Sequence, residues 1–75
     1  MPKINIDEIY IGTNRRPIKE EKVKQLRESI KTNGLLNPIT IDSQGHLIAG
    51  LHRLTACKQL GFKAIECNIF DYQND

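Results

Sequence analysis

One stretch of this chain repeats its apolar residues with a helical period, whereas elsewhere apolar and polar residues alternate over short distances. Between residues 19 and 33, Val23, Leu26 and Ile30 recur at i, i+3 and i+7, which places them on one face of an α-helix. Two glutamates in the first turn and Gly34 directly after the last turn are typical of helix ends. The pattern therefore predicts a helix over residues 19–33.

Four shorter stretches predict strands, because their apolar and polar residues alternate. They are residues 3–6, 39–41, 46–49 and 65–69. Ser43-Gln44-Gly45 separates the second stretch from the third, so we expect a hairpin there. The segment from Tyr10 to Pro17 contains turn-forming residues and is predicted to be irregular.

A second helix is predicted over residues 51–60, where Leu51, Leu54 and Cys57 share one side and Gly61 follows as the stop. The order of elements is then β-α-β-β-α-β. This order is typical of a small α/β fold in which helices cover a sheet. We expect a mixed sheet with both helices as its cover.

The 75 residues suit one small domain, which we expect to span residues 1–75 with an ordered core at 3–70 and a polar tail at 71–75. The net charge of +2 is too small to indicate nucleic-acid binding by itself. No apolar run approaches the roughly 20 residues of a membrane span, and the first residues lack the apolar core of a signal peptide. We therefore expect a cytoplasmic protein with no membrane partner. Cys57 and Cys67 match no zinc-ligand spacing and are expected to be reduced and buried.

Residues 48–61 carry the candidate chemistry, because a strand ends there at Gly50 and a helix begins with His52 and Arg53 in its first turn. The N-terminus of a helix presents unpaired N–H groups and roughly half a positive charge. A phosphate placed there would meet aligned donors, and Arg53 can clamp it through two parallel hydrogen bonds. The alternatives are a surface ion pair for Arg53 and a purely structural hydrogen bond for His52.

Segments in order along the chain resemble the ParB/sulfiredoxin superfamily, most closely the N-terminal domain of ParB partition proteins. They are Glu20 to Ile30, Gly34-Leu35-Leu36-Asn37-Pro38-Ile39, Leu47-Ile48-Ala49-Gly50, His52-Arg53 and Ala56 to Gly61. In ParB proteins the motif Gly-Glu-Arg-Arg-x-Arg-Ala resembles a triphosphate-binding segment for CTP. Here it reads Gly50-Leu51-His52-Arg53-Leu54-Thr55-Ala56, which keeps the glycine, the second arginine and the alanine. The resemblance implies a nucleotide-binding module that acts in a DNA-associated or regulatory context.

The resemblance also implies which residues contact the nucleotide. Asn14-Arg15-Arg16-Pro17 resembles a ParB loop whose arginine reaches toward phosphates, and Lys22, Gln25 and Ser29 match helix positions through which sulfiredoxins touch nucleotide. The spacing of these three residues places them on one helix face. The full candidate set is Gly50, Leu51, His52, Arg53, Thr55, Arg15, Arg16, Lys22, Gln25 and Ser29.

The implied cofactor is a nucleoside triphosphate, CTP or ATP, with Mg²⁺ as an open addition. The implied partners are the nucleotide, DNA reached through additional domains or partner chains, and a second copy in a homodimer. We assign no catalytic residue and no metal ligand. Whether the chain is an enzyme stays open at this point.

Departures from the superfamily define the alternatives. Leu51 replaces the nucleophilic cysteine of sulfiredoxins, and a leucine side chain has no nucleophile for sulfinic acid reduction. Ala49 replaces the aspartate of the free-serine kinases, so a Mg²⁺ would depend on phosphates, water and some other acid. The alternatives are an NTP-dependent phosphotransferase or NTPase and, because two motif arginines are missing, an interaction or regulatory domain without a ligand.

Overall fold

A computed structural model of the chain describes residues 2–12, 17–34 and 37–71. In chain order the elements are β1 (Lys3–Asn5), the single 3₁₀ turn η1 (Ile6–Glu8), α1 (Glu20–Asn33), β2 (Ile39–Asp42), β3 (Leu47–Ala49), α2 (Leu51–Gln59) and β4 (Ala64–Phe70). The predicted order β-α-β-β-α-β is confirmed, with η1 as an addition. The first strand is shorter than predicted because Ile6 already belongs to η1, where its N–H donates to the Lys63 carbonyl at 2.9 Å.

The sheet has the strand order β1-β4-β2-β3. β4 pairs antiparallel with β1 and parallel with β2, and β2 pairs antiparallel with β3, so the predicted mixed sheet is confirmed. Ile39 of β2 lies opposite Cys67 of β4, and Ile41 lies opposite Ile69. Side chains on alternate residues of a strand share one face, and this register gathers apolar residues on the face that α2 covers.

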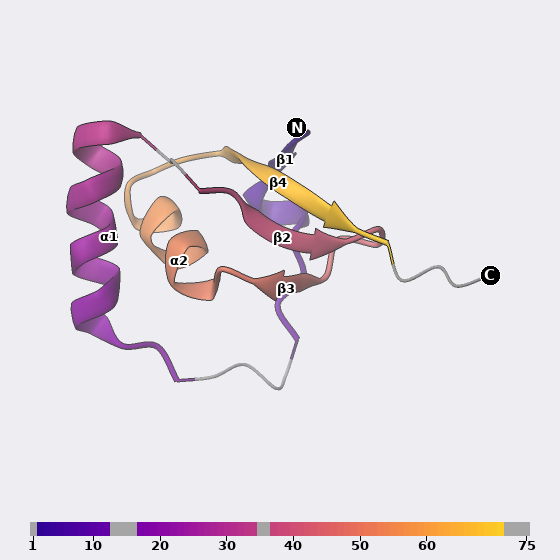
Figure 1. Cartoon of the computed structure of the whole chain (residues 1–75), viewed down its shortest axis with the longest axis horizontal. Coiled ribbons are helices and arrows are strands. Elements are labelled where there is room, and N and C mark those ends of the chain that lie inside the picture. Colours follow the sequence, from indigo (N-terminus) through magenta and orange to yellow (C-terminus); the bar gives the residue numbers. More distant parts are fainter. Residues whose placement is uncertain (1, 13–16, 35–36, 72–75) are drawn as a thin grey trace.

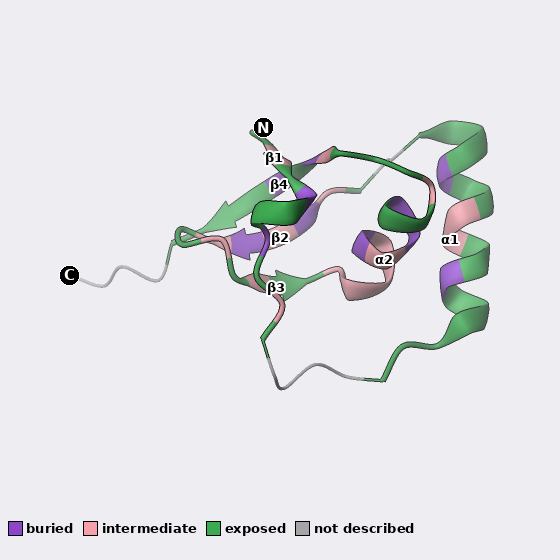
Figure 2. Ribbon diagram, turned by 180° about the vertical axis from the view of Figure 1, so that it is seen from behind, coloured by how far each residue is buried: buried purple, intermediate pink, exposed green. Residues whose placement is uncertain are grey.

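The helices form two successive layers and do not both rest on the sheet. α2 lies between the sheet and α1, which stands at one end of the molecule (Figure 1). α2 can fill this middle position because its buried residues Leu54 and Ala56, two positions apart, lie on nearly opposite sides of the helix. α1 buries Val23 and Ile30, and most of its remaining surface is exposed (Figure 2). The helical cover of the sheet is therefore a sheet–α2–α1 stack, in which α2 makes the direct contact.

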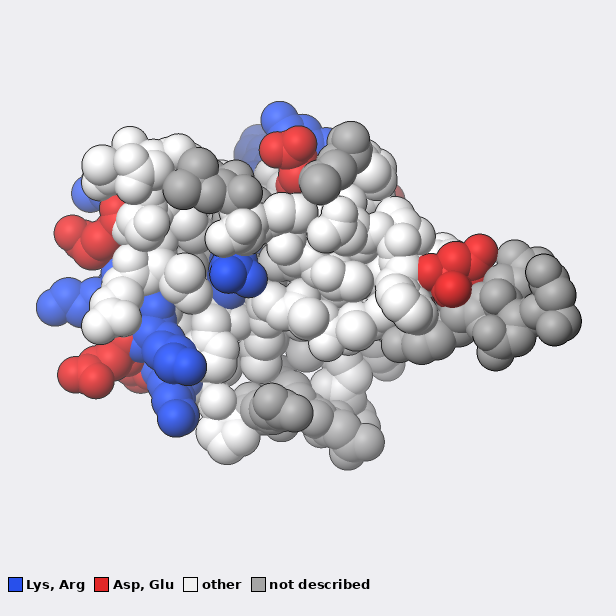
Figure 3. All heavy atoms as spheres, in the orientation of Figure 1, with Lys and Arg blue, Asp and Glu red and all other residues white. Residues whose placement is uncertain are grey.

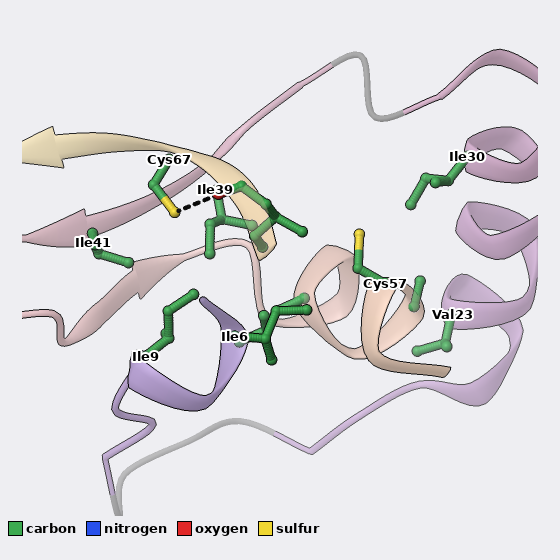
Figure 4. Close-up of a cluster of buried hydrophobic side chains, with 11 residues drawn as sticks. Ile6, Ile9, Val23, Ile30, Ile39, Ile41, Cys57 and Cys67 are labelled. Carbon is green, nitrogen blue, oxygen red and sulfur yellow. Dashed lines mark hydrogen bonds between the residues drawn. The ribbon is translucent and has the colours of Figure 1, made fainter. Parts of the chain in front are cut away.

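One apolar core joins the layers. Val23 and Ile30 point from α1 toward Cys57 of α2 (Figure 4). Ile6 and Ile9, at the two ends of η1, belong to the same buried cluster. The largest side chains with almost no exposed surface are Ile39, Ile41, Leu54, Ile65, Cys57 and Cys67. Both cysteines are free and buried, as predicted, and burial raises the pKa of each thiol.

The β2–β3 turn is held by a network that the sequence pattern did not indicate. The Asp42 carboxylate accepts hydrogen bonds from the backbone N–H of Gln44 at 2.9 Å and of His46 at 2.8 Å, and from the His46 ring at 3.0 Å. These bonds, that from the His46 N–H above all, hold the pKa of Asp42 below its usual 3.8. The predicted hairpin thus closes through an aspartate-centred turn, with Gly45 at φ +90°.

The segment predicted to be irregular begins with a defined contact. Tyr10 forms a parallel bridge with His46. The Tyr10 N–H donates to the Gly45 carbonyl at 2.8 Å, and the Leu47 N–H donates to the Tyr10 carbonyl at 2.9 Å. The rings of Tyr10 and His46 meet edge to face with centroids 5.3 Å apart. Residues 13–16 of the segment and residues 72–75 of the predicted tail lie outside the described residues. Over the described ranges, we find no helix with the length and apolar character that crossing a bilayer requires.

Candidate oxyanion site

The junction between β3 and α2 is a single glycine. β3 ends at Ala49, Gly50 takes φ +104° and ψ +28°, and α2 starts at Leu51. No side chain caps the helix, and its first turn contains no acidic residue. Because the first N–H groups of a helix have no partner within it, this helix start offers donors and a positive field to an anion.

Gly50 is required by the space around it as well as by its backbone conformation. A Cβ built on Gly50 would lie 2.7 Å from Ile39 Cγ2 and 2.9 Å from Ile39 Cβ. Neither atom is the far end of a flexible side chain, so β2 would have to move. Ile39 is itself almost fully buried in the core. The start of α2 is thus pressed directly against the sheet, which fixes where its N–H groups lie.

A pocket of about 580 Å³ opens between the start of α2 and α1. This α1–α2 pocket is lined by Lys22, Gln25, Leu26 and Ser29 of α1 and by Gly50, Leu51, His52 and Arg53. The pocket therefore brings together seven of the ten residues proposed from the sequence. Its volume falls within the usual range of roughly 300–1,000 Å³ for small-molecule sites.

Three of the sequence-based candidates are not among the residues that line the pocket. Thr55 is half-buried, and its hydroxyl donates to the Leu51 carbonyl at 2.8 Å within α2. Arg15 and Arg16 lie outside the described residues. Leu26, which shares a predicted helix face with Val23 and Ile30, packs against the core and also lines the pocket. Its half-buried state shows that it sits where the core face of α1 borders the pocket face.

The pocket lining is cationic. Lys22 and Arg53 contribute positive charges, and the described lining residues include no carboxylate. Figure 3 shows Lys and Arg side chains over the α1 end of the molecule, with Asp and Glu side chains interspersed among them along its outer edge. A cation in the first turn opposes the helix dipole, so Arg53 raises the positive potential where the N–H groups already attract anions.

Two polar contacts tie α1 to α2 around the pocket. The backbone N–H of Lys19, the N-cap of α1, donates to His52 Nε2 at 3.1 Å. Near the other end of α2, Arg27 of α1 donates to the side-chain carbonyl of Gln59. The described residues contain no cluster of three or more histidine, cysteine or acidic side chains that could hold a metal ion. With two cationic side chains and no carboxylate among its described residues, the pocket lining suits an anionic ligand.

Comparison with protein families gives one assignment for the whole chain. The family model described as "ParB N-terminal domain" matches residues 1–75. Among curated proteins, the chain is 46% identical over 57 residues to a probable chromosome-partitioning protein ParB of Rickettsia felis, a match that covers 73% of this chain and 20% of that protein. It is 42% identical over 52 residues to the ParB-like nuclease domain-containing protein YnaK of Escherichia coli, covering 69% of this chain and 60% of that protein. The chain thus spans about a fifth of the length of such partition proteins.

Solved structures share the fold. Sulfiredoxin from Arabidopsis thaliana superposes with a TM-score of 0.85 at 30% identity, covering 93% of this chain and 83% of that one. The C-terminally truncated ParB of Caulobacter crescentus, complexed with CTP-gamma-S, superposes with a TM-score of 0.80 at 23% identity, covering 97% of this chain and 45% of that one. At that identity, the second likeness concerns the fold alone.

Proposed function

The chain belongs to the ParB N-terminal domain family, and from this premise we propose that it binds the phosphates of a nucleoside triphosphate in the α1–α2 pocket. The observation that carries the proposal is the composition of the pocket: an uncapped helix N-terminus, Arg53 and Lys22, with no carboxylate among the described lining residues. A lining of this kind attracts polyanions and offers them both N–H donors and cationic side chains.

Each lining element takes a part in this proposal. The N–H groups after Gly50 and the guanidinium of Arg53 hold the phosphate nearest to α2. Lys22 neutralises charge from the α1 side, while Gln25 and Ser29, further along the same face, offer uncharged hydrogen-bonding groups to the rest of the nucleotide. Arg15 and Arg16 remain proposed phosphate ligands from the sequence.

CTP and ATP are the two proposed ligands. The complex of the Caulobacter crescentus ParB with CTP-gamma-S supports CTP by analogy within the family. No carboxylate lies among the described lining residues, so a Mg²⁺ would enter with the triphosphate, coordinated by phosphate oxygens and water.

The wider context is also a proposal, because the chain spans only a fifth of its partition relatives. We place the module in a cytoplasmic, DNA-associated or regulatory setting, with DNA reached through further domains or partner chains. A related Caulobacter crescentus structure, ParB complexed to the centromeric parS site, supports that setting. A homodimer that forms on nucleotide binding is part of the same proposal, and light scattering with and without nucleotide tests it.

Isothermal titration calorimetry with CTP, ATP, GTP and UTP, each with Mg²⁺, tests the central claim. We expect binding of CTP or ATP by the wild type, and a loss of about 10- to 100-fold in affinity for Arg53→Ala, because a hydrogen bond to a charged group contributes roughly 1.5–3 kcal/mol. Lys58→Ala removes an exposed cation from α2 outside the pocket and is the matched control. Its affinity should stay within about twofold of the wild type.

The same titration separates the alternatives. Absence of heat with every nucleotide at millimolar concentration would overturn the proposal and favour a ligand-free interaction domain. Equal affinity of Arg53→Ala and wild type would move the site away from α2. Release of inorganic phosphate in the same samples, abolished by Arg53→Ala, would assign the NTPase alternative instead.

A further inference from the structure

The helix α1 is attached to the molecule through one neighbour. Among the described residues, α2 is the one element against which α1 makes extensive contact. α1 stands at one end of the molecule, beyond α2 as seen from the sheet (Figure 1). Its buried side chains are Val23 and Ile30, and Leu26 is half-buried beside them. Because packing of an apolar face, more than helix propensity, stabilises a helix in a protein, α1 depends on this single contact.

The sheet and α2 do not depend on α1 in the same way. The four strands pair in one sheet, and α2 contacts that sheet through β2. Beyond the two side chains of α1, the buried core among the described residues comes from η1 with its C-cap, the sheet and α2: Ile6, Ile9, Ile39, Ile41, Leu54, Ala56, Cys57, Ile65 and Cys67. Removal of α1 would uncover one side of α2 and leave the contact between α2 and the sheet in place.

The polar contacts between the two helices are exposed to solvent. The Lys19 N–H donates to His52 Nε2 at 3.1 Å, and Arg27 donates to the side-chain carbonyl of Gln59. Water can take the place of either partner when the helices separate, so each bond contributes only a modest net stabilisation. The buried apolar contact is therefore the main interaction that holds α1 on α2.

We propose that α1 is a releasable wall of the pocket, which separates from α2 and unfolds while the sheet and α2 stay folded. A free helix of 14 residues is marginal in water, so α1 loses its helical structure once it is apart. Proteins commonly open in cooperative units that are less stable than the whole. Because the pocket lies between α1 and the start of α2, this release takes Lys22, Gln25 and Ser29 away from Arg53 and opens the pocket to solvent.

The two buried cysteines lie in different parts of the core and distinguish this release from global unfolding. Val23 and Ile30 of α1 point toward Cys57 (Figure 4). Cys67 belongs to β4, and its thiol donates to the Ile65 carbonyl at 3.5 Å. Both thiols are free and buried. Release of α1 exposes Cys57 and leaves Cys67 covered, whereas global unfolding exposes both.

Alkylation of the wild-type protein with iodoacetamide, in buffer and at low urea concentrations, measures both exposures. Trypsin cuts after Lys58 and Lys63, so mass spectrometry reads Cys57 and Cys67 in separate peptides. Each rate is divided by the rate of the same thiol in denaturant. Cys57 should be alkylated at least about 10-fold faster than Cys67, and with a weaker dependence on urea, because release of α1 exposes less surface than unfolding. Equal rates with equal urea dependence would overturn the proposal.

Two substitutions test the same claim from opposite sides. Ile41→Val removes one methylene from the sheet core, so the Cys67 rate should rise about 2- to 10-fold while the Cys57 rate stays at the wild-type value. Val23→Ala weakens the contact that is lost both on release and on unfolding, so both rates should rise by the same factor. An equal rise of both rates in Ile41→Val would overturn the proposal, because Cys57 would then be exposed by global unfolding alone.

A last measurement connects release to ligand binding and rests on the proposed function. A ligand that contacts both helices binds only the closed form, so inorganic triphosphate should slow Cys57 alkylation by the factor 1 + [L]/Kd. The Cys57 rate in denaturant with triphosphate is the control for the reagent. Triphosphate that binds by calorimetry without slowing Cys57 would refute α1 as a wall of the ligand site. If no triphosphate binds, the proposed function fails, and the ligand-free rates still decide whether α1 is released.

Discussion

Gly50→Ala should be the most disruptive addition of one methyl group at any glycine of this chain. Gly50 has a left-handed φ of +104°, and a new Cβ would lie 2.7, 2.9 and 3.2 Å from Cγ2, Cβ and Cα of Ile39. Real Cβ atoms essentially never approach another heavy atom closer than 3.0 Å. The substitution therefore strains the backbone and also pushes the start of α2 away from β2.

The two effects can be added. A left-handed conformation costs a residue with a Cβ roughly 1–2 kcal/mol. Overpacking a well-filled core typically costs about 1–3 kcal/mol. The free energy of unfolding should thus fall by about 2–5 kcal/mol. A chain of 75 residues has a total of roughly 4–11 kcal/mol by the usual per-residue range, so the variant should lose a large part of its stability.

Urea denaturation followed by circular dichroism measures this loss, and two other glycines separate its parts. Gly61 has φ +86° with no heavy atom within 4 Å of a built Cβ, so Gly61→Ala should lose only the conformational share of about 1–2 kcal/mol. Gly12 is equally open and is not among the positive-φ glycines, so Gly12→Ala should be neutral or gain up to about 1 kcal/mol. Equal losses for Gly50→Ala and Gly61→Ala would refute the reasoning, because the contact with Ile39 would then contribute nothing.

Three further predictions concern the remainder of the fold. The Asp42 pKa is lower in the folded chain than its ordinary 3.8. The ionised Asp42 carboxylate therefore stabilises the fold above about pH 4, and this stabilisation is lost as pH falls through the folded-state pKa. Asp42→Asn should flatten the dependence of the urea midpoint on pH in that range. Because burial raises the pKa of the Cys57 and Cys67 thiols, a thiol reagent should label native protein far more slowly than protein in denaturant, and equal rates would contradict their burial. Leu54→Ala should lower the free energy of unfolding by about 2–5 kcal/mol, because Leu54 is 1% exposed at the centre of the core.

Periodicity was enough to predict the elements, whereas the pocket residues of α1 were implied by the resemblance to sulfiredoxins. The predicted helix over residues 19–33 differs from α1 (Glu20–Asn33) by its N-cap. Spacing added that Lys22, Gln25 and Ser29 share one face of α1, and the structure sets that face against Gly50 to Arg53. Local spacing determines which residues share a helix face, and that is the information these predictions needed.

Contacts between distant segments were beyond the same reasoning. α1 packs on α2 and not on the sheet, and this depends on which side of α2 meets which partner. The sequence pattern identifies apolar residues of α2 but does not say whether they meet a strand or another helix. The bridge from Tyr10 to His46 involves single residues with no repeat. The hydrogen bond from the Lys19 N–H to His52 Nε2 joins a backbone group to a side chain, and any residue type other than proline could provide that donor.

Three features at the start of α2 lower the stability of the helix in the free protein. Its N-cap position is a glycine without a capping side chain, it carries no acidic residue, and it places Arg53 where the helix dipole is already positive. Gly50 is explained by its close approach to Ile39. A missing acid and an added cation have no such packing reason, because Arg53 lines an open pocket. Local choices that oppose stability are expected where a binding site is built, and an anion in the pocket would relieve both conflicts at once. On the proposed function, the same two features weaken the free protein and strengthen its complex with a phosphate, so ligand binding should have its largest stabilising effect at the start of α2.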